Sequence, residues 1–143
     1  MKKFEFIKNG VDDYTLKYKD KEIKFNSTVD LVNRLQDTMA TARMKMIKDL
    51  SAQGMSLKDL IIETKKDGKT YYDNTNKTEL ENIYIQQEQT KIFMNIIEEK
   101  FGMSITDLFA DIGITDEKDG EEFNKQFGEI LVGQFPSKAT TNE

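Results

Sequence analysis

Apolar and polar residues alternate over the first 26 positions, which is the pattern of β-strands with one buried face. A two-residue turn at Asp20-Lys21 would place Tyr18 opposite Ile23 and Leu16 opposite Phe25. All four side chains would then lie on one face of a hairpin. The sequence therefore predicts a β element over residues 1–26.

The period changes to 3.6 residues after Asn26, and one apolar stripe continues through the next two dozen positions. This pattern predicts a single long helix from about Val29 to Gln53, ended by Gly54. Its inward face is expected to consist of residues spaced by three or four: Val32, Leu35, Met39, Ala42, Met46 and Leu50.

Turn and capping residues divide the next segment of the chain. Ser56 is a favourable N-cap for a second, short helix that carries three large aliphatic residues. Residues 66–77 are polar around Asp67-Gly68, and this composition fits either a loop or a small hairpin.

Three more helices are predicted in the second half of the chain. Thr78 and Glu81 match a capping box, which predicts the start of a helix that ends at Gly102. A short helix is expected from Ser104 to Ile112, and another from Thr115 onward. The inward residues of the first of these helices are expected to be Leu80, Ile83, Tyr84, Met94, Ile97 and Phe101.

One short sequence occurs twice, each time after a long helix. Gly54-Met55-Ser56-Leu57-Lys58-Asp59-Leu60 matches Gly102-Met103-Ser104-Ile105-Thr106-Asp107-Leu108 in its pattern. Either convergence on a favourable turn or duplication of a helical hairpin explains the repeat. Both explanations predict positive φ at the two glycines and a serine N-cap after each.

Together these elements predict an α+β, mainly helical fold, in which a β hairpin or small sheet is followed by about five helices that form a bundle. Residues 1–135 are expected to form a single domain, with the β element at 1–26 and the helical part at 28–135. Residues 136–143 are polar and are expected to be a disordered tail.

The composition excludes several kinds of chemistry. The 143-residue chain contains no cysteine and no histidine, so disulfides, thiolate nucleophiles and histidine-based acid–base or metal chemistry are excluded. The acidic run at residues 116–120 departs from a calcium loop, because Thr115 and Gln126 would occupy two ligand positions. Since no phosphate loop, nucleophile elbow or dinucleotide motif is present either, we expect no enzyme activity, no cofactor and no metal site.

The charge distribution argues against nucleic acid and membrane partners. The formal net charge is −5, and Lys and Arg are spread along the whole chain rather than clustered. A helix-turn-helix over Ala42–Lys66 would place Asp49, Gln53 and Glu63 where that motif buries apolar side chains. No apolar stretch approaches the ~20 residues of a membrane span, and the N-terminus lacks the apolar run of a signal peptide.

Apolar residues that are poorly explained as core are the candidate contacts with a protein partner. Met44 lies off the main stripe of the long helix, and methionine adapts to varied apolar surfaces. The last predicted helix is weakened by three glycines, Gly120, Gly128 and Gly133. One face of it carries Phe123, Phe127, Ile130 and Leu131. This face either docks on the core of the chain or detaches and docks on a partner.

Several phrases of the sequence, taken in order, resemble a known family. They are Phe4-Glu5-Phe6, Tyr18-Lys19-Asp20-Lys21-Glu22, Val29-Asp30-Leu31-Val32, Lys66-Asp67-Gly68-Lys69-Thr70-Tyr71-Tyr72-Asp73 and the two Gly-Met-Ser turns. With a small β element, then helices, then a polar tail, the chain resembles the tail assembly chaperones of long-tailed, siphovirus-type phages of Gram-positive bacteria.

The resemblance implies a role in virion assembly. Such chaperones bind the apolar, helical tape measure protein, keep it soluble, and are displaced as tail tube subunits polymerise around it. The implied partners are therefore the tape measure and tail tube proteins, with a possible homo-oligomer, in the cytoplasm of the infected bacterial host. The family contributes no catalytic residues, and it often makes a longer frameshifted product.

Two other functions stay open at this level. One is a phage- or plasmid-borne inhibitor whose acidic surface mimics nucleic acid and blocks a host defence protein; carboxylates clustered on one exposed face would favour it. The other is a structural subunit of the virion, which would be present in purified particles. Dispersed charges with an exposed apolar groove would favour the chaperone.

Overall fold

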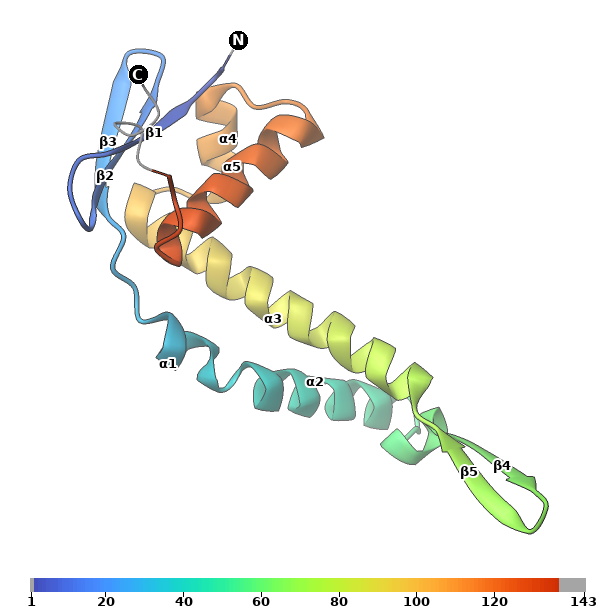
Figure 1. The fold of residues 1–143 in the computed structure, drawn as a ribbon. Helices are drawn as coiled ribbons and strands as arrows, with labels where there is room; N and C mark the ends of the chain where they lie inside the picture. The colour runs from blue at the N-terminus through green and yellow to red at the C-terminus, as the bar shows by residue number, and fades with distance from the viewer. Residues whose placement is uncertain (1, 137–143) are drawn as a thin grey trace. The chain divides into compact units, whose positions relative to one another are not determined.

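The computed structural model describes residues 2–136 of the chain, and the contacts divide it into two compact units (Figure 1). Unit 1 comprises Met1–Asp30 and Met94–Glu143, and unit 2 comprises Leu31–Phe93. The first strands are antiparallel and helices dominate the rest, so the α+β, mainly helical class is confirmed. The single domain over 1–135 and the bundle stay predictions, and the predicted tail lies, from residue 137 on, outside the described residues.

A three-stranded antiparallel sheet opens unit 1, with β1 (Glu5–Lys8), β2 (Asp13–Tyr18) and β3 (Lys21–Asn26) in that order. The β2–β3 turn consists of Lys19-Asp20, not Asp20-Lys21, so Leu16 lies opposite Ile23 and Tyr18 opposite Lys21. Lys19 adopts a positive φ of 51°, which the sequence pattern does not predict. Because the register differs by two residues, the side chains keep the predicted face, where Leu16 and Tyr18 are buried.

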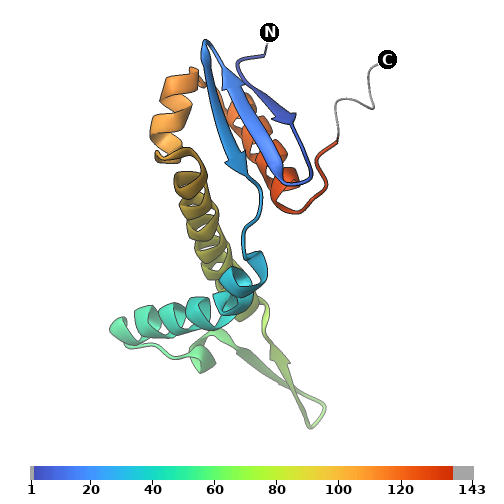
Figure 2. The same cartoon turned by 90° about the vertical axis from the view of Figure 1, so that its left-hand side faces the viewer.

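Three helical segments bury the apolar face of this sheet: the end of α3 (Thr75–Phe101), α4 (Ile105–Ile112) and α5 (Glu117–Leu131). The core between them is aromatic. The ring centroids of Phe6 and Phe123 are 5.1 Å apart, and the Phe101 ring lies 4.9 Å from Phe25 and 5.2 Å from Phe127. Strand residues thus contact residues of α5 directly, and α5 lies against the sheet (Figure 2).

Capping groups set the ends of these helices. Gly102 has a φ of 74° after α3, and the Ser104 side chain accepts a hydrogen bond from the Asp107 amide at the start of α4, both as predicted. α5 begins at Glu117 rather than at Thr115, because the Asp116 side chain accepts from the Asp119 amide. Gly133 was expected to weaken this helix, but it lies beyond the last helical residue with a φ of 74° and helps to end it.

A polar cluster ties the sheet to α4. The Tyr18 hydroxyl donates to Asp111 Oδ2 over 2.6 Å, and Lys21 Nζ donates to the same oxygen over 2.8 Å. Burial, together with the Asp111 contact, raises the pKa of Tyr18 to about 12. Hydrogen bonds from Lys21 and Tyr18 lower the pKa of Asp111, so the carboxylate is favoured in the folded state.

Unit 2 begins with two helices where one was predicted. α1 (Leu31–Gln36) and α2 (Thr38–Ala52) are separated at Asp37, so the prediction of a continuous helix from Val29 is wrong. Asp37 has φ −100° and ψ 10°, and its carbonyl accepts from the Thr41 amide as the N-cap of α2. The Asp37 side chain makes no capping hydrogen bond, so the interruption is a change of backbone conformation at this residue.

The next elements are a short 3₁₀ turn, η1 (Leu57–Leu60), and a hairpin of β4 (Ile62–Lys66) and β5 (Lys69–Asp73). The hairpin alternative for the polar segment is therefore correct, and it starts four residues earlier than expected. Asp67 and Gly68 have φ values of 55° and 74°, and positive φ at both positions is what a type I′ turn needs.

α3 starts at Thr75, three residues before the predicted capping box. The Asp73 carboxylate accepts hydrogen bonds from the amide and the hydroxyl of Thr75, and it caps the helix in the role predicted for Thr78. The Thr78 amide already donates to the Asn74 carbonyl within the first turn, so the Thr78 capping box is wrong.

Candidate partner-binding surface

Buried and exposed apolar side chains are distributed very differently between the two units. Fifteen of the buried apolar residues belong to unit 1, whereas unit 2 buries only Ala42, Met46 and Leu50. Unit 2 nevertheless exposes ten large apolar side chains: Val32, Leu35, Met39, Met44, Ile47, Met55, Ile62, Tyr71, Tyr72 and Ile83. An unusual concentration of exposed apolar side chains marks a candidate interaction surface.

α2 has two apolar faces of which only one is covered. Its buried residues recur at every fourth position: Thr38, Ala42, Met46 and Leu50. The opposite side carries what we call the outer face, formed by the exposed residues Ala40, Met44, Ile47 and Ser51. Met44 is 71% exposed and Ile47 is 44% exposed. The outer face is therefore apolar without being part of the core of unit 2.

A groove continues the outer face at the C-terminal end of α2. Its volume is about 510 Å³, and it extends from the last turns of α2 to the start of η1. We call it the α2 groove, and it is lined by Ile47, Leu50, Ser51, Met55, Ser56, Leu57 and Lys58. Gly54 positions this chain reversal with a φ of 75°, as the Gly-Met-Ser repeat predicted. The groove has the chemistry of a pocket for an aliphatic or aromatic side chain.

Polar contacts hold the inner side of α2 to α3. Lys45 Nζ donates to Glu88 Oε2 over 2.6 Å, and the Tyr84 hydroxyl donates to Asp49 Oδ2 over the same distance. The Lys45 contact lowers the pKa of Glu88, while the hydrogen bond to Asp49 raises that of Tyr84. Because these contacts fix α2 from its inner side, the outer face of the helix stays available at the surface.

The β4–β5 hairpin adds further exposed apolar surface to unit 2. Every residue of both strands is exposed, including Ile62, Tyr71 and Tyr72. A two-stranded hairpin with no covered face is marginal in stability on its own. The hairpin is thus a second element of unit 2 whose surface is suited to contact with another molecule.

The structure separates the predicted partner-binding residues into two groups. Phe123 and Phe127 are fully buried and Ile130 is 2% exposed, so they belong to the core of unit 1 in this conformation, and their contact with a partner stays a prediction. The alternative that this helix docks on the core is what the structure shows, because the sheet supplies an aromatic face for it. Leu131 is half-buried near the end of α5. Of the five predicted contact residues, Met44 is the one that is well exposed.

The predicted contact residues did not include Ile47 or Met55, which both line the groove. Ile47 was assigned no role, although it stands three residues after Met44 on the same side of the helix. Met55, in the turn after α2, is 36% exposed. The spacing of Met44, Ile47 and Ser51 was the signal in the sequence that could have revealed the second face.

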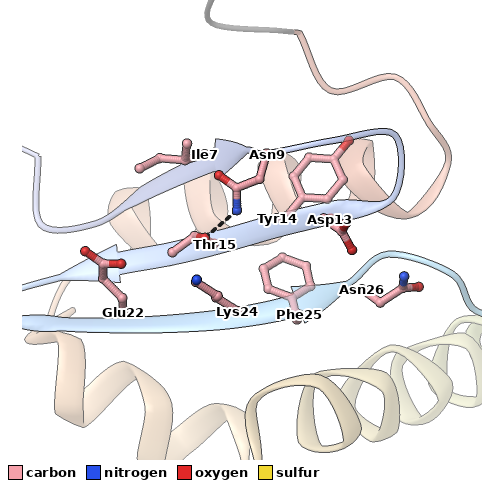
Figure 3. Close-up of a pocket in the computed structure, with 9 residues that line it drawn as sticks. All are labelled: Ile7, Asn9, Asp13, Tyr14, Thr15, Glu22, Lys24, Phe25 and Asn26. Carbon is pink, nitrogen blue, oxygen red and sulfur yellow. Dashed lines mark hydrogen bonds between the residues drawn. The ribbon is translucent and has the colours of Figure 1, made fainter.

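A second hollow, of about 610 Å³, lies on the sheet of unit 1 (Figure 3). Its lining mixes polar and apolar side chains, and the Asn9 amide donates to the Thr15 hydroxyl oxygen over 2.6 Å within it. Burial raises the pKa of Tyr14 at its floor. The full lining is Ile7, Asn9, Asp13, Tyr14, Thr15, Glu22, Lys24, Phe25 and Asn26. These residues form neither a nucleophile–base pair nor an oxyanion site.

Within residues 2–136, no three acidic side chains are gathered closely enough to hold a metal ion. None of the helices in the same part of the chain combines the length and apolarity needed to cross a membrane.

Comparison with known proteins identified no relative. No family model, no curated protein and no solved structure matches the chain.

Proposed function

We propose that this protein is a tail assembly chaperone of a long-tailed phage, which binds the tape measure protein, keeps it soluble and helps to recruit tail tube subunits. The observation that carries the proposal is the exposure of ten large apolar side chains in unit 2 beside only three buried ones. The resemblance in the sequence supplies the identity of the partner. The proposal includes a non-catalytic role, location in the host cytoplasm, and about five helices that form one bundle.

The arrangement of unit 2 suits reversible binding of an amphipathic helix. A chaperone of this kind needs apolar anchors at helical spacing, and the outer face of α2 supplies them. Its affinity for the tape measure protein must also be low enough for tube subunits to displace it. Methionine anchors such as Met44 and Met55 adapt to varied sequences without demanding one fixed fit.

Co-expression tests the proposal. The chain is produced together with a helical fragment of the tape measure protein encoded by the neighbouring gene, and the soluble and co-purified fractions of the fragment are measured. We expect the wild type to keep the fragment soluble and Met44→Asp/Ile47→Asp to lose this effect, because charges replace two exposed apolar anchors. Val11→Asp is the matched control, since Val11 is 85% exposed in a turn of unit 1. A fragment that aggregates equally with and without the wild type would contradict the proposal.

The inhibitor hypothesis is less well supported by the distribution of charge. Unit 1 is the acidic part of the chain, with 17 acidic and 11 basic side chains by sequence, whereas unit 2 has nine acidic and ten basic ones. On the exposed side of α5, however, Lys118 and Lys125 lie among the glutamates. The carboxylates therefore do not form a continuous row that could imitate the phosphates of a nucleic acid. A structural virion subunit would be found in purified particles, and the proposed chaperone would be absent from them.

A further inference from the structure

We propose that the outer face of α2 and the α2 groove together bind an amphipathic helix whose apolar seam is flanked by Asp and Glu side chains. This inference rests on the proposed function, because it names the chemistry of the helix that such a chaperone would hold. It also assigns the binding site to unit 2 and predicts a charge preference that the resemblance does not imply.

The spacing of the outer face is that of a helix-binding seam. Ala40, Met44, Ile47 and Ser51 are separated by intervals of four, three and four residues. This interval pattern is the one that presents a continuous row of side chains to an adjacent helix. Small residues at both ends and large ones in the middle permit close approach around two central anchors.

The α2 groove gives this seam a defined end. Ile47 belongs to both features, and Leu50, Met55 and Leu57 surround the space beyond it. A volume of about 510 Å³ exceeds that of a single large side chain, so the groove has room for a leucine, methionine or phenylalanine of a partner helix. The seam and the groove are continuous along about 20 Å of α2, taken from the rise per residue of a helix.

The charged residues that flank the outer face or line the groove are basic, while the Asp59 carboxylate accepts a hydrogen bond from the Ser56 amide beside the groove. Arg43 and Lys48 flank the outer face on its two sides, and Lys58 lines the groove, which has no carboxylate in its lining. Arg43 Nε lies 2.9 Å from Glu81 Oε2, and the Arg43 side chain is half-exposed. Lys48 and Lys58 form no ion pair with any other described residue. A partner with acidic flanks would satisfy these ammonium groups and would be attracted at long range.

The same charges disfavour a second copy of the chain as the occupant. A symmetric contact between two outer faces would bring Arg43, Lys48 and Lys58 of both copies together. Like charges across an interface are destabilising, particularly where apolar contact excludes water. Unit 1 is acidic, but its exposed large apolar side chains among the described residues are only Val11, Met94 and Val132.

Two designed peptides test the inference on the full-length protein. Both are fluorescently labelled 20-residue helices with the same leucine and methionine seam, one with glutamate and the other with lysine at the flanking positions. Fluorescence anisotropy in ~50 mM and ~300 mM salt measures their affinities. We expect the acidic peptide to bind at least about fivefold more tightly than the basic one at low salt, with a smaller ratio at high salt.

Variants assign the effect to the site. Lys48→Glu/Lys58→Glu is expected to reverse the preference between the peptides, while Ile47→Asp is expected to remove binding of both. Lys118→Glu/Lys125→Glu is the matched control, because it makes the same charge change at exposed positions of α5 in unit 1. Far-UV circular dichroism and thermal unfolding establish that each variant is folded before its affinity is compared.

The outcomes distinguish the inference from the proposed function. Equal affinity for both peptides, or an unchanged preference in Lys48→Glu/Lys58→Glu, would overturn the inference even if the tape measure fragment is still kept soluble. Selective binding of the acidic peptide, lost in Ile47→Asp, would support the inference even if the tape measure fragment is not held, in which case the partner of the proposed function is wrong. Self-association reduced by Ile47→Asp in sedimentation experiments, without peptide binding, would also overturn it in favour of a second copy.

Discussion

Truncation of Phe127 to alanine tests whether α5 is an integral part of unit 1. Its side chain is fully buried, and its ring centroid lies between 5.2 and 6.3 Å from those of Phe6, Phe25, Phe101 and Phe123. These four rings come from β1, β3, α3 and α5 itself. The Phe127 ring therefore joins rings from two strands and two helices of the aromatic core.

The environment of the ring sets the expected magnitude. Burial of a phenylalanine side chain contributes roughly 1.5–3 kcal/mol through removal of apolar surface from water. Neighbouring rings and the cavity left behind add to this value, and buried Phe→Ala substitutions generally destabilise by about 3–5 kcal/mol. Against a total stability of ~5–15 kcal/mol, Phe127→Ala is expected to remove a large part of the free energy of unfolding.

Urea unfolding, followed by far-UV circular dichroism and by tyrosine fluorescence, gives the measurement, since the chain has no tryptophan. Leu131→Ala is the control, because Leu131 is on the same helix but only half-buried, and we expect it to cost less than ~2 kcal/mol. A loss below ~1 kcal/mol for Phe127→Ala would mean that α5 is a detachable arm and would refute the core assignment.

Three further predictions concern single positions. Gly102→Ala should destabilise by ~1 kcal/mol because its φ is 74°, whereas Gly128→Ala, in open space within α5, should stabilise by a few tenths to ~1 kcal/mol in the same urea assay. Thr38→Val should raise the melting temperature, since the buried Thr38 hydroxyl has no hydrogen-bond partner, and such a group costs about 1–3 kcal/mol. The pKa of Tyr18 is raised in the folded state, so folding favours the neutral phenol. The stability that this shift contributes is complete below pH ~10 and is lost as pH rises toward about 12. The free energy of unfolding of the wild type should therefore fall more steeply over this range than that of Tyr18→Phe.

Local signals in the sequence predicted local structure well where the structure depends only on the backbone conformation of a few residues. The positive φ angles of Gly54 and Gly102 and the Ser104 N-cap were all predicted from residue type and position. Such features depend on a few consecutive residues, and glycine at a left-handed helix end has few alternatives.

Helix ends were predicted less well where two caps compete within a few residues. Asp73 and Thr78 are both good N-caps, and the sequence pattern alone favours the capping box of Thr78. The hairpin decides between them, because β5 ends at Asp73 and leaves its side chain free to accept two hydrogen bonds from Thr75. The choice depends on a strand that was itself only an alternative at the sequence level.

The two Gly-Met-Ser turns show that burial determines how long a helix continues after a shared start. After Ser104 the helix continues for eight residues, and it buries Leu108 and Ile112 against unit 1. After Ser56 the chain forms only the 3₁₀ turn η1, which buries none of its residues, and then enters β4. The same cap therefore begins a helix in one unit and a single turn in the other, since only one unit offers an apolar surface to cover it.

The errors in predicted burial occur mainly in the helices of unit 2. Val32, Leu35 and Met39 were expected to face inward with Ala42, Met46 and Leu50, and only the last three are buried. An apolar stripe shows which face of a helix favours contact, but it does not show that the same chain supplies the surface. In unit 1 the aromatic face of the sheet supplies it, whereas unit 2 has a fully exposed hairpin and only part of α3. Under the proposed function, the partner supplies the missing surface for unit 2, so the residues whose burial was wrongly predicted are the first positions at which to search for binding.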